Sequence, residues 1–265
     1  MLKLPDKIKN DLHVHSFRSR CGQHDYFVLY QQAKRKRMSS IAVTDHGLDL
    51  GGMATPSTFL EYERTPAKME GVRVFRGIEA NLRIDGTTDV QEKYEKQLDI
   101  ILLGIHATRD NNPKFQYLSP EDRTLLLPTG ESETYYTALL HRAIAQNSID
   151  VITHPPLAKF PINMDAIVEA CKEKGVAIEL NNSIYANKRK NDPKKHREMI
   201  DAINKYVPRI VISSDAHCYM EIGELGAVKR ILKEYPIEAD VELVNRTLKS
   251  TEAFVKERKE LRQAA

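Results

Sequence analysis

The chain has 265 residues, which is enough for one large α/β barrel or for two small domains. Its 40 Lys and Arg residues nearly balance 37 Asp and Glu residues, and the net charge of +3 gives no reason to expect a nucleic-acid-binding surface. Cys21, Cys171 and Cys218 are irregularly spaced, so they predict reduced thiols in a reducing compartment rather than a disulfide framework or a CxxC motif.

The N-terminal stretch and the apolar runs predict no signal peptide and no membrane-spanning helix. The stretch Met1–Asn10 lacks the apolar centre of a signal peptide. The longest apolar run, near Ile100–Ile105, is far too short to cross a bilayer. We therefore expect a cytoplasmic protein with no membrane partner.

Short apolar runs along the chain predict buried strands. They are continuous rather than alternating, as is typical of strands that are covered on both faces. There are seven of them: Ile8–Val14, Ser40–Thr44, Arg73–Ile78, Leu98–Gly104, Asp150–Thr153, Val176–Leu180 and Arg209–Ser213.

Amphipathic stretches between most of these runs predict helices. They lie at Tyr26–Arg37, Glu133–Gln146, Met164–Lys174, Pro193–Tyr206 and Glu221–Glu234. Asn163 is placed to cap the N-terminus of one of them, and Gly175 follows the end of the same helix.

The alternation of strands and helices indicates either a doubly wound sheet or a closed barrel. In a barrel the C-terminal ends of all strands face one side, whereas an open sheet builds its site mainly at one switch point. Candidate ligands follow at least six of the seven predicted strands, which favours the barrel. Seven strands rather than eight predict a distorted TIM-like α/β barrel, as a single domain over residues 1–265.

Three stretches interrupt the pattern. Gly47–Pro66 and Ala107–Gly130 are long, polar and follow candidate ligands, so we expect loops at the mouth of the barrel. Glu238–Ala265 is predicted to form two helices that end in a charged, frayed tail. His141 and His196 fall within predicted helices and are expected on the surface.

Histidines and acids cluster where the predicted strands end. The clusters are Asp11-Leu-His13-Val-His15, Thr44-Asp45-His46-Gly47, Gly77-Ile-Glu79-Ala-Asn81, Gly104-Ile-His106, Thr153-His154-Pro155 and Ser213-Ser-Asp215-Ala-His217. Side chains two residues apart on a strand share one face, so His13 and His15 can grip one ion together. Imidazoles and carboxylates that converge on one spot are typical of a multi-metal site.

A structural explanation is available for each of these groups alone, because a single strand-end histidine more often bonds to the backbone than to a metal. It does not account for so many strand-end groups at once. Glu79 closes an apolar strand, and a buried acid is usually paired or bound to metal, so a carboxylate that bridges two cations would satisfy it. Asp11 and Asp45 are candidates for orienting an imidazole.

Taken in order, DLHVH, TDHG, GIEAN, GIH, THPP, ELNNS and SSDAH resemble the motifs of the PHP (polymerase and histidinol phosphatase) superfamily. The closest resemblance is to its bacterial phosphatase group with a trinuclear zinc site. It extends from Asp11 to about Leu248 and implies a distorted seven-stranded barrel that hydrolyses phosphoesters. The related group also implies a homotrimer.

The resemblance implies three zinc ions that share ligands. The first would be held by His13, His15, Glu79 and Asp215, the second by Glu79, His106 and His154, and the third by His46, His217 and one residue of the loop after His15.

The last of these ligands is where the sequence departs from the family pattern. Position matching without a gap selects Cys21, whereas ligand type selects His24. An imidazole ligand is compatible with zinc, manganese and iron, whereas a thiolate ligand favours zinc. We expect His24 to be the ligand, since a Gly-containing turn before the first helix can aim it inward.

The expected chemistry is hydrolysis of a small phosphate ester by a hydroxide that bridges two cations about 3.5–4 Å apart. Glu79, Asp215 and His217 are the expected catalytic residues, and Arg18 and Arg189 are expected to bind the substrate phosphate. Zinc is the expected cofactor, with manganese or iron as alternatives.

The main alternative is a PHP-type nuclease or phosphodiesterase acting on nucleic-acid ends or nucleotides. The near-neutral charge and the lack of an aromatic, basic strip argue against it, so the expected partner is a small phosphorylated substrate rather than nucleic acid. The complete ligand set argues against a non-catalytic scaffold. Hydrolysis of C–N bonds on a similar barrel would be expected to use a carboxylated lysine, whose pattern the sequence lacks.

Overall fold

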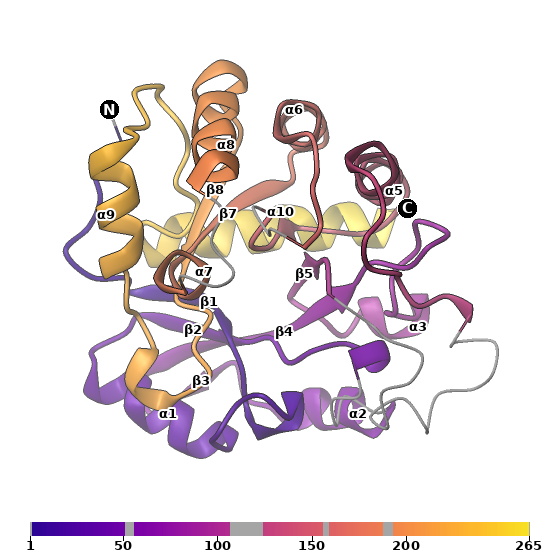
Figure 1. Ribbon diagram of the computed structural model, residues 1–265. Helices are drawn as coiled ribbons and strands as arrows, with labels where there is room; N and C mark the ends of the chain where they lie inside the picture. Colours follow the sequence, from indigo (N-terminus) through magenta and orange to yellow (C-terminus); the bar gives the residue numbers. More distant parts are fainter. Residues whose placement is uncertain (1, 51–55, 107–123, 156–158, 188–192, 265) are drawn as a thin grey trace.

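The computed structural model describes residues 2–50, 56–106, 124–155, 159–187 and 193–264, and the statements below concern these residues. Parallel strands follow one another around a nearly closed barrel (Figure 1). In barrel order they are β1 (Asn10–Val14), β2 (Ser40–Val43), β4 (Val72–Asn81), β5 (Ile100–Gly104), β6 (Val151–Ile152), β7 (Ala177–Asn181) and β8 (Ile210–Ser213).

The last strand returns to the first. Val14 and Ala216 form a parallel bridge, and the backbone N–H of His15 donates to the carbonyl of Ala216 at 2.8 Å. The predicted α/β barrel is therefore confirmed. One short strand that was not predicted, β3 (Lys68–Met69), pairs antiparallel with β4.

Helices surround the strands. They are α1 (Tyr26–Arg35), α2 (Pro56–Arg64), α3 (Glu92–Glu95), α5 (Glu133–Gln146), α6 (Met164–Lys174), α7 (Asn182–Ala186), α8 (Pro193–Tyr206), α9 (Gly226–Glu234) and α10 (Leu248–Ala264), with 3₁₀ turns at Phe17–Ser19, Leu48–Leu50 and Tyr219–Glu221. The ends of α6 are as predicted: Asn163 accepts a hydrogen bond from the N–H of Ala166, and Gly175 has a φ of 64°.

Two hydrophobic clusters hold the fold together. One lies between the strands and the outer helices. The other fills the barrel interior with one or two side chains from each of the barrel strands and with three residues from the C-terminal region: Leu12, Ala42, Phe75, Ile100, Leu102, Val151, Ala177, Val211, Val244, Phe254 and Val255. The interior is thus a packed core and not a channel, so polar chemistry is confined to the barrel ends.

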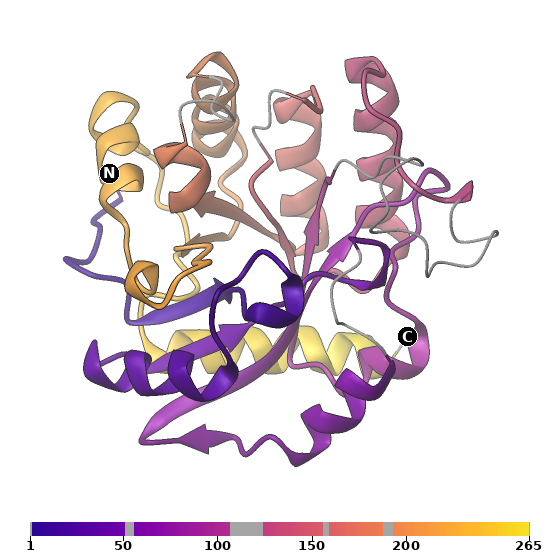
Figure 2. The same ribbon diagram turned by 60° about the horizontal axis from the view of Figure 1, so that its bottom comes forward.

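Helix α10 contributes Phe254 and Val255 to this interior and crosses one end of the barrel (Figure 2). Arg258 and Arg262 point inward to buried Asp150, and both also donate to backbone carbonyls just before β5, β6 and β7. The prediction of two helices with a frayed tail was wrong, because the described part of Glu238–Ala265 holds one helix, α10, and two of its arginines bind one buried carboxylate.

Other expectations also need correction. Helix α2 lies within the stretch Gly47–Pro66 that was predicted to be a loop. His196 is buried against the ring of Tyr185, 4.5 Å away, rather than on the surface, whereas His141 is exposed. Most of the second predicted loop, residues 107–123, lies outside the described residues. In the described part of the chain, no helix has the length and apolarity needed to cross a membrane.

Candidate metal centre

The strand-end clusters meet at the C-terminal ends of the barrel strands. β1 is followed by His15, β2 by His46, β5 by His106, β6 by His154, and β8 by Asp215 and His217, while His13 and Glu79 lie within β1 and β4. A register irregularity between Asp11 and Val14 interrupts the pairing of β1 with β2. Neighbouring side chains on a regular strand point to opposite faces. This irregularity allows Leu12 to pack in the barrel interior and the next residue, His13, to face the site at the end of the barrel.

Glu79 lies at the centre of the site and is fully buried. Its Oε1 lies 2.7 Å from His154 Nε2 and 3.3 Å from His106 Nε2. Its Oε2 lies 2.8 Å from His46 Nδ1 and faces the β1 histidines at 3.4–3.5 Å. Each carboxylate oxygen thus faces a different set of imidazoles, which is the arrangement that a bridging ligand requires.

Asp215 completes the other side of the site. Its Oδ1 lies 3.2 Å from His15 Nε2 and 3.6 Å from His13 Nε2, and its Oδ2 accepts a hydrogen bond from Asn181 at 3.2 Å. The backbone of Asp215 has a φ of 53°, a left-handed conformation that is uncommon for a residue with a side chain and tends to occur at functional sites.

Most of the imidazoles are oriented by acceptors on their Nδ1 side. His13 Nδ1 donates to Glu179 at 2.8 Å, and His106 Nδ1 donates to the side-chain oxygen of Asn81 at 2.7 Å. His217 Nδ1 donates to the carbonyl of Asp215 at 2.9 Å. With the Nδ1 proton committed, Nε2 of each neutral ring carries a lone pair that can bind a metal.

His15 is oriented through a hydroxyl group. Ser19 Oγ donates its proton to Asp45 at 2.6 Å, so it accepts from His15 Nδ1 at 2.9 Å. Asp45 also accepts from the backbone and side chain of Ser16 and from the hydroxyl of Tyr26. The expectation that Asp45 orients an imidazole therefore agrees with the geometry. Asp11 instead binds the backbone of Ser214 and Gly223, which fixes the loop after β8.

The geometry of the nitrogen atoms fits a bound cation. His13 Nε2 and His15 Nε2 lie 3.1 Å apart, although both rings have committed their Nδ1 protons. Two lone pairs at this distance repel unless a metal ion or an additional proton lies between them. Similarly, His46 Nδ1 and Glu79 Oε2 are 2.8 Å apart, yet neither makes a hydrogen bond. Both atoms are therefore available to bind one metal ion.

The imidazoles of the site differ in protonation. Burial lowers the pKa of His15 to about 3 and that of His106 to about 4, so both rings are neutral near pH 7. Burial acts in the same direction on His13 and His46, but the nearby carboxylates outweigh it and raise the pKa of both, so these rings carry a proton that a bound metal would displace. Burial alone would raise the pKa of Glu79, but the positive charge on neighbouring histidines outweighs it and lowers that pKa. Neutral imidazoles and ionised carboxylates are the forms that bind metals.

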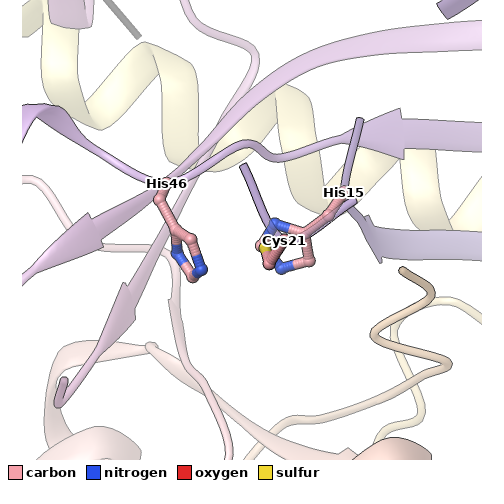
Figure 3. A group of neighbouring side chains, drawn as sticks. All are labelled: His15, Cys21 and His46. Atoms are coloured by element: carbon pink, nitrogen blue, oxygen red, sulfur yellow. The ribbon is translucent and has the colours of Figure 1, made fainter. Parts of the chain in front are cut away.

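The loop after His15 brings Cys21 into the site, and not His24. The ligand atoms of His15, Cys21 and His46 all lie within 4.8 Å of one another (Figure 3). His24 Nε2 instead lies 3.7 Å from Cys218 Sγ, and its ring packs edge-on against Tyr219. This placement differs from the expectation for His24, because backbone hydrogen bonds turn its side chain towards the chain after β8.

Of the two arginines expected to bind phosphate, the one that the structure describes has partners outside the ligand clusters. Arg18 forms an ion pair with Glu61 on α2 and lies over the ring of Tyr26. Arg189 lies outside the described residues. Glu179 was not among the predicted site residues, although it belongs to the ELNNS motif, because it lies inside the predicted strand Val176–Leu180 and not at its end.

Comparison with known proteins gives consistent results. The family model of the PHP domain matches residues 11–183. A "probable phosphatase" of Aeromonas hydrophila is 31% identical over 87% of this chain and 87% of that protein, and one of Citrobacter koseri is 32% identical over 84% of each. The crystal structure of histidinol phosphate phosphatase from Lactococcus lactis, complexed with zinc, L-histidinol and phosphate, superposes with a TM-score of 0.54 at 14% identity. That superposition covers 89% of this chain and 95% of the other, and it supports the fold.

Proposed function

The chain belongs to the PHP domain family, and from this premise we propose that it is a metal-dependent phosphatase that hydrolyses a small phosphate ester at a multinuclear site. The observation that carries the proposal is the position of Glu79, whose two oxygens face separate sets of imidazoles. Relatives that are named probable phosphatases and cover most of the chain support the reaction class.

The proposed ligands group around this carboxylate. His13, His15 and Asp215 form one set whose ligand atoms are close together, and His46, Glu79 and His106 form another. His154 Nε2 adds to the second set through its 2.7 Å contact with Glu79.

Bound ions supply Lewis acidity, which lowers the pKa of water and offsets the charge of a phosphate group. The residues of the chain hold the site in the form that this chemistry needs. Glu179, Ser19 and Asn81 fix the imidazole orientations from behind. Asp215 Oδ1 lies 3.6 Å from His13 Nε2 and from His217 Nδ1, and the charge of the neighbouring histidines outweighs burial and lowers the pKa of Asp215, so its carboxylate is held ionised as a ligand must be.

The proposal also includes the more specific features that the sequence predicts. They are three ions with zinc as the first choice, catalytic roles for Glu79, Asp215 and His217, a small phosphorylated substrate, a cytoplasmic location and a homotrimer. For Arg18 to bind phosphate, its ion pair with Glu61 must open.

A substrate and metal screen tests this function. The purified protein is stripped with a chelator, reloaded with zinc or manganese, and assayed on p-nitrophenyl phosphate, histidinol phosphate and a panel of phosphometabolites. Single-stranded DNA serves as the competing substrate. We expect metal-dependent release of phosphate from at least one small ester. Efficient degradation of DNA with no ester hydrolysed would instead favour the nuclease, and no metal-dependent activity at all would reject both.

A further inference from the structure

The thiol of Cys21 lies among the imidazoles of the metal centre. Its Sγ lies within 4.8 Å of a ring nitrogen of His46, which follows β2, and the nearby ring of His217, which follows β8, helps to lower its pKa although burial acts in the opposite direction. Cys21 itself comes from the loop after β1 and is exposed to solvent. Three potential ligands thus converge from three different strand ends, in the region that Figure 3 shows for His15, Cys21 and His46.

The backbone holds this loop in place. Gln23 N–H donates to the carbonyl of His217 at 2.9 Å, and Phe17 N–H donates to the carbonyl of His24 at 2.8 Å. Gly22 packs so closely on the end of β1 that a Cβ there would lie 2.2 Å from the carbonyl oxygen of Ser16. The position of Cys21 is therefore built into the fold, since the residues on either side of it are anchored to β1 and to the chain after β8.

His46 and His217 each have one ring nitrogen that is available to a metal beside Cys21. His217 commits Nδ1 to the carbonyl of Asp215, and His46 directs Nδ1 at Glu79, so each has Nε2 remaining. Imidazole nitrogen and thiolate sulfur are both zinc ligands, and a tetrahedral ion held by three residues has a fourth position open. The other two ligand groups of the site contain only nitrogen and oxygen atoms.

We propose that Cys21, His46 and His217 hold a third ion through a thiolate, and that this sulfur makes the position selective for zinc over manganese. Binding would release the thiol proton to solvent as the Sγ–metal bond forms. Manganese prefers carboxylate, carbonyl and water ligands, so it should fill only the positions near Glu79 and Asp215. The inference rests on the proposed multinuclear site and names the ligand and metal preference of one part of it.

Cobalt spectroscopy combined with metal counting tests the proposal. A cobalt–thiolate bond gives a charge-transfer absorption in the near ultraviolet, which imidazole and carboxylate ligands do not give. We expect this band in the cobalt-loaded protein and expect Cys21→Ser to abolish it and to lower the zinc content by about one ion per chain. Cys21→His should restore the zinc content without the band. Zinc content should exceed manganese content by about one ion per chain.

Matched controls come from the neighbouring residues. Cys218→Ser removes a nearby thiol, and His24→Ala removes the competing imidazole, so both should keep the band and the zinc content. A band that survives in Cys21→Ser but is lost in Cys218→Ser would overturn the assignment, as would a loss of zinc in His24→Ala alone. If the protein binds metal and hydrolyses esters but shows no band, only this inference fails. If it binds no metal, the proposed function fails with it.

Discussion

Glu179 Oε1 lies 2.8 Å from His13 Nδ1, and both side chains are completely or almost completely buried. The other oxygen of Glu179 accepts hydrogen bonds from the backbone N–H of His154 and from Asn181, each at 2.9 Å. One carboxylate within β7 therefore fixes the ring of His13, which comes from β1, and the backbone of His154, which follows β6. It would orient two proposed ligands from outside the clusters of ligand atoms.

Glu179→Gln tests this orienting role. The amide can still accept from His13, but it has no charge and its NH₂ group cannot accept from the backbone of His154. We expect metal affinity to fall by about 10–100-fold, as for other residues behind metal ligands. Metal titration followed by elemental analysis measures the loss, with the exposed Glu173→Gln on α6 as the control. Unchanged affinity would show that Glu179 only fills space.

Glu79→Gln tests the centre of the site. The substitution keeps the size of the side chain but removes the charge that allows it to serve two ions. We expect at least about a hundredfold loss of phosphatase activity, a typical loss when a charge-stabilising group is removed from an active site. Circular dichroism should show an intact barrel, and Glu169→Gln on the exposed face of α6 should behave as the parent protein. Near-normal turnover would mean that Glu79 is structural.

Removal of metal should change both activity and stability. The Nε2 atoms of His13 and His15 face each other at 3.1 Å, so the site is least stable when no cation separates them. We expect a chelator to abolish ester hydrolysis and to lower the melting temperature. Free zinc at a hundredfold excess over Kd should add about 2.7 kcal/mol to the free energy of unfolding for each site. A melting curve that does not respond to zinc would argue against a metal centre.

Much of the fold could be predicted because its signals are local. Strands buried on both faces are continuous apolar runs, so β2 and β8 were located nearly to the residue. Convergence of the ligands then follows from the barrel itself, since all strand ends share one face. Both ends of helix α6 were predicted correctly, because Asn163 and Gly175 cap the backbone of the residues next to them in sequence.

The features that were not predicted depend on contacts between residues that are far apart in the sequence, which local sequence patterns do not reveal. The role of Glu179 depends on a contact with His13 across 166 positions of sequence. The choice between Cys21 and His24 depends on how one loop is anchored to the chain after β8, and ligand type alone pointed to the residue that the structure turns away. Helix α10 was misread for the same reason, because its arginines resemble a solvated tail until Asp150 is placed beside them.

The buried cluster of Asp150, Arg258 and Arg262 gives a prediction about stability that is independent of the metal centre. Asp150 Oδ1 lies 2.6 Å from Arg262 Nη1 and 3.2 Å from Arg258 Nε, and Oδ2 accepts from the N–H of Ile101. Asp150→Ala leaves two guanidinium groups buried without their carboxylate. Because removing one partner of a buried ion pair is costly, we expect the free energy of unfolding to fall by about 3–5 kcal/mol.

Urea denaturation of the metal-free protein measures this change, and Asp201→Ala on α8 is the control. The side chain of Asp201 is 69% exposed and pairs with Arg197 on the same helix, so its removal should alter the free energy of unfolding by no more than about 0.5 kcal/mol. Zinc content of folded Asp150→Ala should match the parent protein, since α10 crosses the end of the barrel away from the ligands. A loss of zinc without a loss of stability would contradict this separation of the two barrel ends.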